Sequence, residues 1–215
     1  MRFWTLAVVL GIAYCVGQGA EATNVAAEPF KASASKRMFP QGRAEAPIGY
    51  IDFCQGNRLE CLPDGPVLER VSLSPERWRE LVTLNREINE AIRPMSDSAQ
   101  YGMIERWTYP EHGFGDCEDY VLLKRRKLME LGWPQSALLI TVVRDENNEG
   151  HAILTVRTSQ GDFVLDNKHS KVLPWQRTPY IFIKRQSGKD PRQWVSLVPV
   201  QPSLPVASAG VDWKD

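Results

Sequence analysis

The chain has little cysteine, little histidine and no excess of charge of either sign. These properties limit the classes of function that the sequence can support. Its 215 residues include four cysteines and three histidines, which is little material for a zinc site. Its 26 basic residues are balanced by 26 acidic ones. This balance predicts neither nucleic acid nor an anionic membrane surface as a partner. Beyond the first residues no apolar run is long enough to cross a bilayer.

The N-terminus has the pattern of a secretory signal peptide. Arg2 precedes an apolar run over residues 3–16, which is too short to span a bilayer, and Ala20-Glu21-Ala22 is an A-x-A cleavage site. We therefore predict a signal peptide over residues 1–22, an exported protein, and no stable membrane insertion after signal removal. A lipoprotein reading through Cys15 is disfavoured because the bulky Tyr14 precedes it.

The remaining cysteines fit an oxidising compartment. Cys54 and Cys61 lie close together in a loop-like stretch, so they are candidates to pair after export. Cys117 is then left over, and an odd cysteine in a secreted protein is a free reactive thiol or an intermolecular link. Zinc binding by the pair is the weaker alternative because the spacing is not C-x2-C.

Periodicity predicts an α+β fold, with helices first and an antiparallel sheet afterwards. Ser74-Pro75-Glu76 marks a helix start, and Pro94 ends that helical run. A second helix is expected over 117–131, stopped by Gly132. The period then changes to two, and the expected strands are 137–143, 152–158, 162–166 and 180–185. The domain organisation we expect is a flexible lead-in over 23–46, one domain over 47–200 with loops over 47–72, and a loop-like tail that includes 201–215.

Cys117 lies inside an acidic cluster, Gly115-Asp116-Cys117-Glu118-Asp119-Tyr120, at the expected start of the second helix. A helix N-terminus favours a thiolate, which is the reactive form of a nucleophilic cysteine. A lone cysteine on an amphipathic helix is more often a small buried apolar residue. Three acidic neighbours are unusual beside a residue of the apolar core, because ionised carboxylates are rarely buried. They therefore favour a functional thiol.

The same acids oppose ionisation of the sulfur. One carboxylate ~6 Å away, at an effective dielectric of ~20, costs roughly 2.8 kcal/mol, or about 2 pKa units. A counter-charge is therefore expected: protonated His151, or a divalent cation, for which carboxylate oxygens favour Ca²⁺. In the alternative reading, Asp116 and Asp119 form a capping box and serve only the helix.

His151 and Asp166 are expected on two neighbouring strands. If residues 158–161 form a tight turn, Ile153 lies opposite Asp166 and His151 is its diagonal neighbour on the same face. A register slip of one residue would separate them. His112 and His169 compete for the role, one before the thiol and the other facing away from Asp166. Three aromatic side chains of the loop before Cys117 are candidates for a substrate groove: Trp107, Tyr109 and Phe114.

The motifs around Cys117, Gly150-His151-Ala152 and Leu165-Asp166-Asn167 together resemble the bacterial transglutaminase-like cysteine proteinases. That family includes the LapG-type periplasmic proteases, which release biofilm adhesins. The resemblance covers about residues 47–186. It implies a papain-like or transglutaminase-like core and a periplasmic location. It also implies a Cys-His-Asp triad, which falls on Cys117, His151 and Asp166.

The resemblance also implies a cofactor and partners. In LapG-type members, acids flanking the cysteine bind calcium, and the matching positions are Asp116 and Glu118. The implied partners are a protein substrate, such as a surface adhesin, and an inner-membrane receptor for cyclic di-GMP that restrains the protease.

We therefore predict an exported cysteine peptidase, calcium-dependent and acting on a cell-surface protein. A transglutaminase or amidase is the first alternative, because it uses the same acyl-enzyme. A non-enzymatic calcium-binding module with an inert Cys117 is the second.

Overall fold

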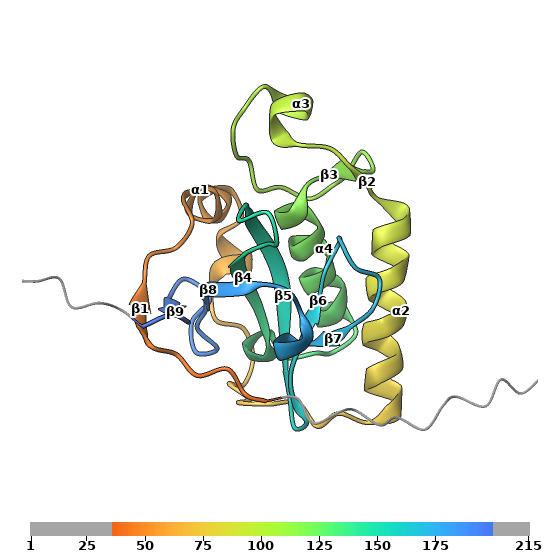
Figure 1. The fold of residues 1–215 in the computed structure, drawn as a ribbon, viewed down its shortest axis with the longest axis vertical. Coiled ribbons are helices and arrows are strands. Elements are labelled where there is room, and N and C mark those ends of the chain that lie inside the picture. The colour runs from red at the N-terminus through yellow and green to blue at the C-terminus, as the bar shows by residue number, and fades with distance from the viewer. Residues whose placement is uncertain (1–35, 200–215) are drawn as a thin grey trace, which may run out of the picture. The chain divides into compact units, whose positions relative to one another are not determined.

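The computed structural model describes residues 36–199 and has the α+β architecture expected from the sequence (Figure 1). The helices lie in the first two thirds of the chain and the main strands follow them. The α-helices are α1 (Ile48–Gly56), α2 (Pro75–Ala91), α3 (Asp97–Tyr101) and α4 (Cys117–Glu130). Short 3-10 helices cover Arg58–Cys61, Gln135–Ala137 and Trp175–Arg177. None of the helices in this range is long and apolar enough to cross a bilayer.

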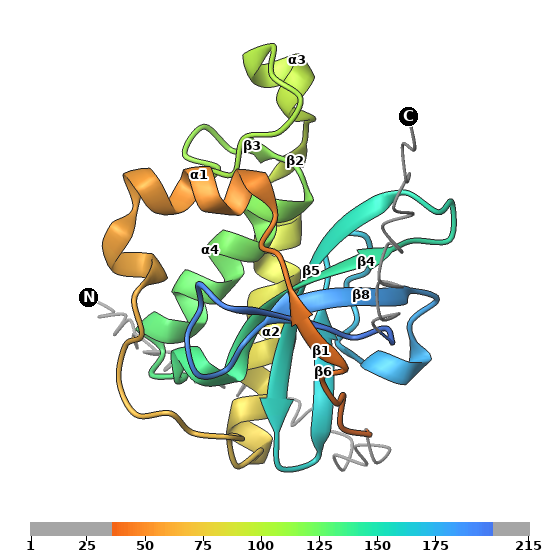
Figure 2. The same cartoon turned by 90° about the vertical axis from the view of Figure 1, so that its left-hand side faces the viewer.

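The main sheet has seven strands in the order β1-β9-β8-β4-β5-β6-β7, with every pair antiparallel. Its strands are β1 (Gly42–Ala44), β4 (Leu138–Arg144), β5 (Gly150–Thr158), β6 (Gly161–Leu165), β7 (Leu173–Pro174), β8 (Ile181–Gln186) and β9 (Trp194–Ser196). Two short strands, β2 (Arg93–Pro94) and β3 (Phe114–Gly115), pair separately. Figure 2 shows α2 and α4 packed beside the strands, so the sheet supports the helix that carries Cys117.

Local sequence explains the two long helices. The Ser74 hydroxyl accepts a hydrogen bond from the Arg77 N–H at 3.2 Å, and Pro75 occupies the first helical position of α2. Leu81 and Ile88 of α2 are buried at helical spacing. α4 begins at Cys117, as expected, and it packs against both α2 and β5.

The β5–β6 hairpin has the register that the sequence predicted. Thr158 pairs with Gly161 and Leu154 pairs with Leu165, so Asp166 follows directly after the partner of Leu154. Gly161 has a φ of 110°, a left-handed conformation that glycine adopts without strain. His151 and Asp166 are thereby brought to the same end of neighbouring strands.

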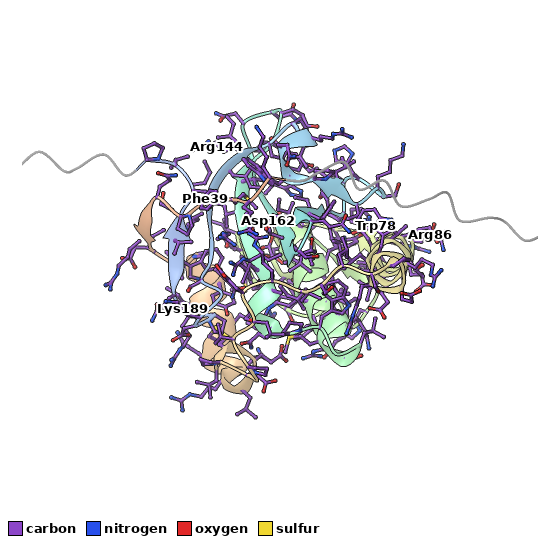
Figure 3. The ribbon with its side chains drawn as sticks, turned by 90° about the horizontal axis from the view of Figure 1, so that it is seen from below. Phe39, Trp78, Arg86, Arg144, Asp162 and Lys189 are labelled. Atoms are coloured by element: carbon purple, nitrogen blue, oxygen red, sulfur yellow. A yellow bond between two sulfur atoms is a disulfide. The ribbon has the colours of Figure 1, made fainter. Side chains whose placement is uncertain are left out.

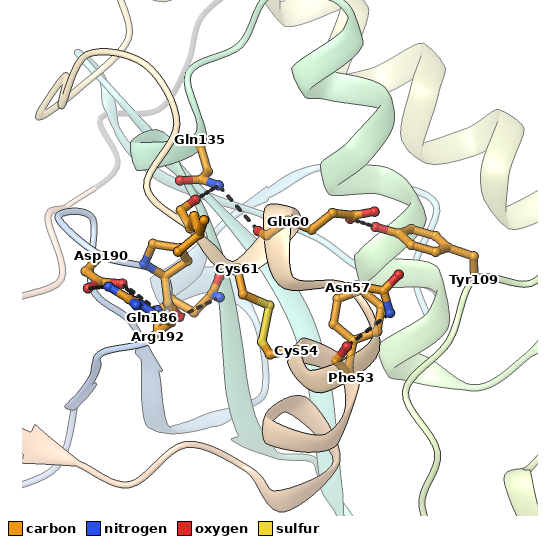
Figure 4. Close-up of a disulfide and its surroundings, with 12 residues drawn as sticks. Phe53, Cys54, Asn57, Glu60, Cys61, Tyr109, Gln135, Gln186, Asp190 and Arg192 are labelled. Carbon is orange, nitrogen blue, oxygen red and sulfur yellow. Dashed lines mark hydrogen bonds and ion pairs between the residues drawn. A yellow bond between two sulfur atoms is a disulfide. The ribbon is translucent and has the colours of Figure 1, made fainter.

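The stretch 47–72 is not only loop, contrary to our expectation. It contains α1 and a 3-10 helix, which the Cys54–Cys61 disulfide joins with a Cα–Cα distance of 5.7 Å (Figure 4). The prolines and glycines of this stretch favoured a loop prediction. In addition, α1 is short and buries few side chains, Tyr50 and Phe53 among them, so it shows little helical periodicity. The expected disulfide is thus present, and Cys117 is free.

The folded domain begins earlier than predicted. Met38 is buried, and β1 pairs with β9, so the described part of the expected lead-in belongs to the domain. The segment expected to be loop-like after residue 188 also contains β9, in which Trp194 is buried. Both strands have three residues, too few to reveal an alternating pattern. The signal peptide (1–22) and the tail (201–215) lie outside the described residues.

Candidate active site

Cys117 opens α4 and lines a pocket of about 390 Å³. His151, at the start of β5, lines the same pocket, as do Trp107 and Lys184. The Ala152 N–H donates a hydrogen bond to the Cys117 sulfur at 3.4 Å, which ties the start of α4 to β5. The structure therefore brings the predicted nucleophile and the predicted base to one cavity, although they are 34 residues apart in the sequence.

His151 and Asp166 form a buried pair. The His151 Nε2 atom lies 2.8 Å from the Asp166 Oδ1 atom, and the two side chains are each 2% exposed. The Tyr180 hydroxyl donates to Asp166 Oδ2, and the Lys168 N–H donates to Oδ1 at 3.0 Å. Burial raises the pKa of Asp166, but hydrogen bonding and the charge of His151, with help from Tyr180, outweigh it and leave the pKa below 3.8. The carboxylate is therefore ionised and held on both oxygens.

This pair orients the imidazole. Because Nε2 is engaged by Asp166, Nδ1 is the ring nitrogen left to exchange a proton with a thiol. Tyr180 packs its ring against His151 edge-on at 5.5 Å, which limits rotation of the imidazole. The competing histidines are elsewhere: His112 is exposed, and His169 packs against Tyr180 outside the pocket lining.

The acids crowd the sulfur as the sequence suggested. Cys117 donates its thiol hydrogen to Glu118 Oε2 at 3.1 Å. Burial, followed by the charge of Glu118, raises the pKa of Cys117 well above 9.0. In this arrangement Glu118 competes with His151 for the thiol proton, and the thiol is the favoured form.

Asp116 does not cap α4 with its side chain. Its Oδ2 accepts a 3.3 Å hydrogen bond from the Asp97 N–H, so it faces α3 instead. Asp119 accepts a hydrogen bond from the Thr108 N–H at 2.9 Å and is also held by the backbone N–H of Asp116. The Asp116 half of the expected capping box is therefore absent, and the Asp116 carboxylate needs another explanation.

Asp97, Asp116 and Glu118 offer carboxylate oxygens that all lie within 4.8 Å of one another. Oδ1 of Asp97 and Oδ1 of Asp116 are buried without a hydrogen-bond partner among the described residues. Burial, and then the charges of Glu118 and Asp97, raise the pKa of Asp116 to about 8. Orphaned hard oxygens of this kind fit a divalent cation such as Ca²⁺.

Sequence reasoning found Asp116 and Glu118 but missed Asp97. Asp97 lies 19 residues before Asp116, in the first turn of α3. The Ser96 hydroxyl caps that helix through the Ala99 N–H, so Asp97 reads in the sequence as an ordinary first-turn acid. Only the return of the chain through β2 and β3 brings it to the start of α4.

Of the three aromatic residues proposed for the pocket wall, Trp107 alone lines the pocket. Tyr109 packs against Phe53 and bonds to Glu60 beside the disulfide (Figure 4). Phe114 lies under Arg93. A Cβ atom on Gly49 would lie 2.4 Å from the Trp107 ring, so glycine there allows α1 to approach this tryptophan.

A thiol at a helix start, with a strand histidine held by a buried aspartate, on an α+β core, defines a protein of the cysteine-peptidase class. The chain belongs to the bacterial transglutaminase-like cysteine proteinase family (BTLCP), whose model matches residues 40–201. It is accordingly a transglutaminase-like cysteine peptidase.

Similar solved structures are three forms of Legionella pneumophila LapG. The calcium-bound form is 22% identical with a TM-score of 0.49, covering 63% of this chain and 77% of that one. LapG itself is 23% identical with a TM-score of 0.48, covering 58% and 69%. The EGTA-treated form is 22% identical with a TM-score of 0.48, covering 60% and 72%. No curated protein sequence matches the chain.

Proposed function

We propose that this peptidase hydrolyses peptide bonds through a triad of Cys117, His151 and Asp166. The observation that carries the proposal is the buried pair of His151 and Asp166, because its histidine lines the same pocket as Cys117. His151 Nδ1 takes the thiol proton as the sulfur attacks the carbonyl carbon, and it later protonates the leaving amine. Asp166 keeps the proton on Nε2. Water then hydrolyses the thioester, with His151 again as the base.

The start of α4 contributes to stabilising the oxyanion. The Cys117 N–H lies in the first turn, where amides have no partner within the helix. When the sulfur bonds to the carbonyl carbon, the carbonyl oxygen becomes an oxyanion. That oxyanion lies near the Cys117 N–H, which can donate a hydrogen bond to it, and near the positive end of the helix dipole.

We also propose calcium dependence, based on this chain's own acids. Asp97, Asp116 and Glu118 would hold the ion, which would supply positive charge beside the sulfur. A cation held there would offset the charge of Glu118, which accepts the thiol hydrogen of Cys117, and would leave His151 as the base for that proton. One of the similar LapG structures is the calcium-bound form. Our proposal rests on the carboxylate oxygens of Asp97 and Asp116 in this chain, which have no hydrogen-bond partner among the described residues.

Alkylation kinetics of Cys117 test both proposals. Iodoacetamide near neutral pH should modify Cys117 faster in Ca²⁺ than in EGTA, and His151→Ala should slow the reaction in both. His112→Ala is the matched control, because His112 is exposed and outside the pocket. Equal rates for wild type and His151→Ala would contradict the assignment of the base. Equal rates with and without Ca²⁺ would contradict the calcium proposal alone.

Water is the acceptor we propose, because the family is one of proteinases. The transglutaminase alternative predicts that a labelled amine is joined to a glutamine peptide without peptide cleavage. Mass spectrometry of the products distinguishes the two reactions, since hydrolysis creates a new peptide N-terminus and transfer does not.

We further propose that the protein is exported to the periplasm and acts on a surface protein such as an adhesin, under control of an inner-membrane receptor. The Cys54–Cys61 disulfide supports export, because disulfides persist in oxidising compartments. Fractionation of cells tests the location: the protein should appear in the periplasmic fraction with residues 1–22 removed.

A further inference from the structure

A second pocket, of about 480 Å³, lies away from the candidate active site and is rich in arginine. Arg70, Arg157 and Arg185 all line it. Arg157 lies six residues after His151 on β5, which is roughly 20 Å along the strand. On β8, Lys184 lines the active-site pocket, and its neighbour Arg185 lines this one.

Positive charge in this pocket exceeds the negative charge that faces it. Arg70 makes a 2.7 Å ion pair with the buried Asp162. Glu69 also lines the pocket, but its side chain is 86% exposed and lies 3.9 Å from Arg157. Two acids therefore face three arginines, and Arg37 and Lys189 add further charge at the pocket wall. Figure 3 shows Phe39, Asp162 and Lys189 on this part of the molecule.

Arg185 is the strongest sign of a missing ligand. It is 3% exposed, and within residues 36–199 the one hydrogen bond of its Nη2 goes to the Met38 carbonyl oxygen, at 3.4 Å. Its Nε and Nη1 atoms are buried without a hydrogen-bond partner among the described residues, and so is Nε of Arg157. Burial lowers the pKa of Arg185 to about 10, with the neighbouring arginines adding to the effect against Asp162. The group is still charged at neutral pH, and a buried charge with unused donors is costly.

We propose that this pocket binds a small organic anion through Arg157 and Arg185, which grip its phosphate or carboxylate group. Guanidinium groups bind such oxyanions with paired N–H donors, and the unused donors here belong to two such groups. The pocket is larger than a lone phosphate requires. Phe39, Pro40 and Val67 form an apolar part of its wall, which suits the uncharged body of the ligand.

Calorimetric titration of the full chain tests this inference. The probes are inorganic phosphate, phenyl phosphate and benzoate, with ionic strength held constant by NaCl. Phenyl phosphate or benzoate should bind more tightly than inorganic phosphate, because the ring contacts the apolar wall. A preference for phenyl phosphate identifies a phosphate ester as the ligand class, and a preference for benzoate identifies a carboxylate. If none of the three probes binds at ~10 mM, the inference is overturned.

Two variants locate the binding. Arg157→Gln removes one guanidinium at the partly exposed edge, and Arg185→Lys keeps the charge but loses the paired donors. Each should weaken binding by at least about tenfold, the loss of one good charge-assisted contact. Arg79→Gln, on the exposed side of α2, is the matched control and should bind like wild type.

A thermal-shift measurement separates binding from a structural role. The probe that binds most tightly in the titration should raise the melting temperature of wild type and Arg79→Gln, and it should raise that of Arg157→Gln clearly less. If Arg157→Gln responds to the anion as wild type does, the arginines only hold the fold and the inference fails. These readouts use no substrate, so they stand or fall independently of the proposed peptidase mechanism.

Discussion

At the residue scale, the Asp166 carboxylate is held more firmly than the proposed triad alone requires. Both of its oxygens accept hydrogen bonds, from His151 and Lys168 on one and from Tyr180 on the other. Asn89 of α2 also donates to the Asp166 backbone carbonyl at 2.8 Å. The orientation of the imidazole thus depends on Tyr180 and Asn89, which lie far apart in the sequence.

Tyr180→Phe should lower kcat by about tenfold or more, with KM little changed, because one hydrogen bond to the ionised Asp166 is lost. Tyr109→Phe is the matched control. It removes a tyrosine bond to another carboxylate, that of Glu60, away from the candidate active site. That variant should lose stability and keep wild-type kcat. Equal kcat for Tyr180→Phe and wild type would show that Tyr180 does not position the triad.

Asp166→Asn should reduce activity much more severely, because the amide no longer fixes the proton on His151 Nε2. The measurement is kcat/KM on a cleaved peptide. Asp64→Asn is the control, since Asp64 is exposed. A loss confined to thermal stability, with unchanged kcat/KM, would contradict the role of Asp166 in the triad.

At the element scale, the sequence predicted the features that local signals set and missed those that depend on distant contacts. The Ser-Pro-Glu start of α2, the β5–β6 register and the first residue of α4 followed from local signals, which act within a few residues. Asp97 and the pairing of β1 with β9 did not, because each depends on contacts between segments distant in the sequence. Hydrophobic periodicity predicts local secondary structure and does not predict contacts between distant segments.

The acids at the N-terminal end of α4 should make the calcium-free protein less stable as pH rises. Burial and mutual repulsion raise the pKa values of Asp116 to about 8 and Asp119 to about 7 in the folded state. A carboxyl with a raised folded pKa stabilises the fold below its unfolded value of 3.8, and this stability is lost as pH rises through the folded value. The melting temperature in EGTA should therefore fall between about pH 5 and pH 8.

Added Ca²⁺ should remove most of that fall, since it binds the ionised carboxylates of the folded state. Asp97→Asn should weaken this response, and Asp64→Asn should leave it intact. A melting temperature in EGTA that rises steadily from pH 5 to pH 8 would contradict the raised pKa values.

The disulfide belongs to the same scale because it joins α1 to the 3-10 helix after it. Replacing Cys54 and Cys61 together by serine should cost no more than about 2.5 kcal/mol, because the closed loop is short. Urea unfolding with and without reductant measures this. A loss several times larger would mean that the bond does more than restrict the unfolded chain.

At the scale of the whole molecule, the segment before β1 completes the core. Met38 packs with buried side chains from four strands and the loop before β8: Val143, Ile153, Val164, Tyr180 and Phe182. Its N–H donates to Asp162 Oδ2 at 2.8 Å. This contact links the N-terminal segment to the sheet face that also carries the arginine-rich pocket.

Met38→Ala should therefore cost about 2–5 kcal/mol of unfolding free energy, as expected for a large-to-small change in a core. Met103→Ala is the control, because Met103 is exposed and its truncation leaves no cavity. Chemical denaturation of both variants measures the difference. If Met38→Ala were as stable as the wild type, the segment before β1 would not contribute to the core and would be a flexible lead-in, as the sequence suggested.

The most direct test of the account is cleavage of a peptide library in Ca²⁺, read by mass spectrometry as new peptide N-termini. The wild-type protein should generate them, Cys117→Ala should generate none while melting cooperatively, and His112→Ala should match the wild type. Cleavage by Cys117→Ala at the wild-type rate would show that the thiol is not the nucleophile and would contradict the central claim.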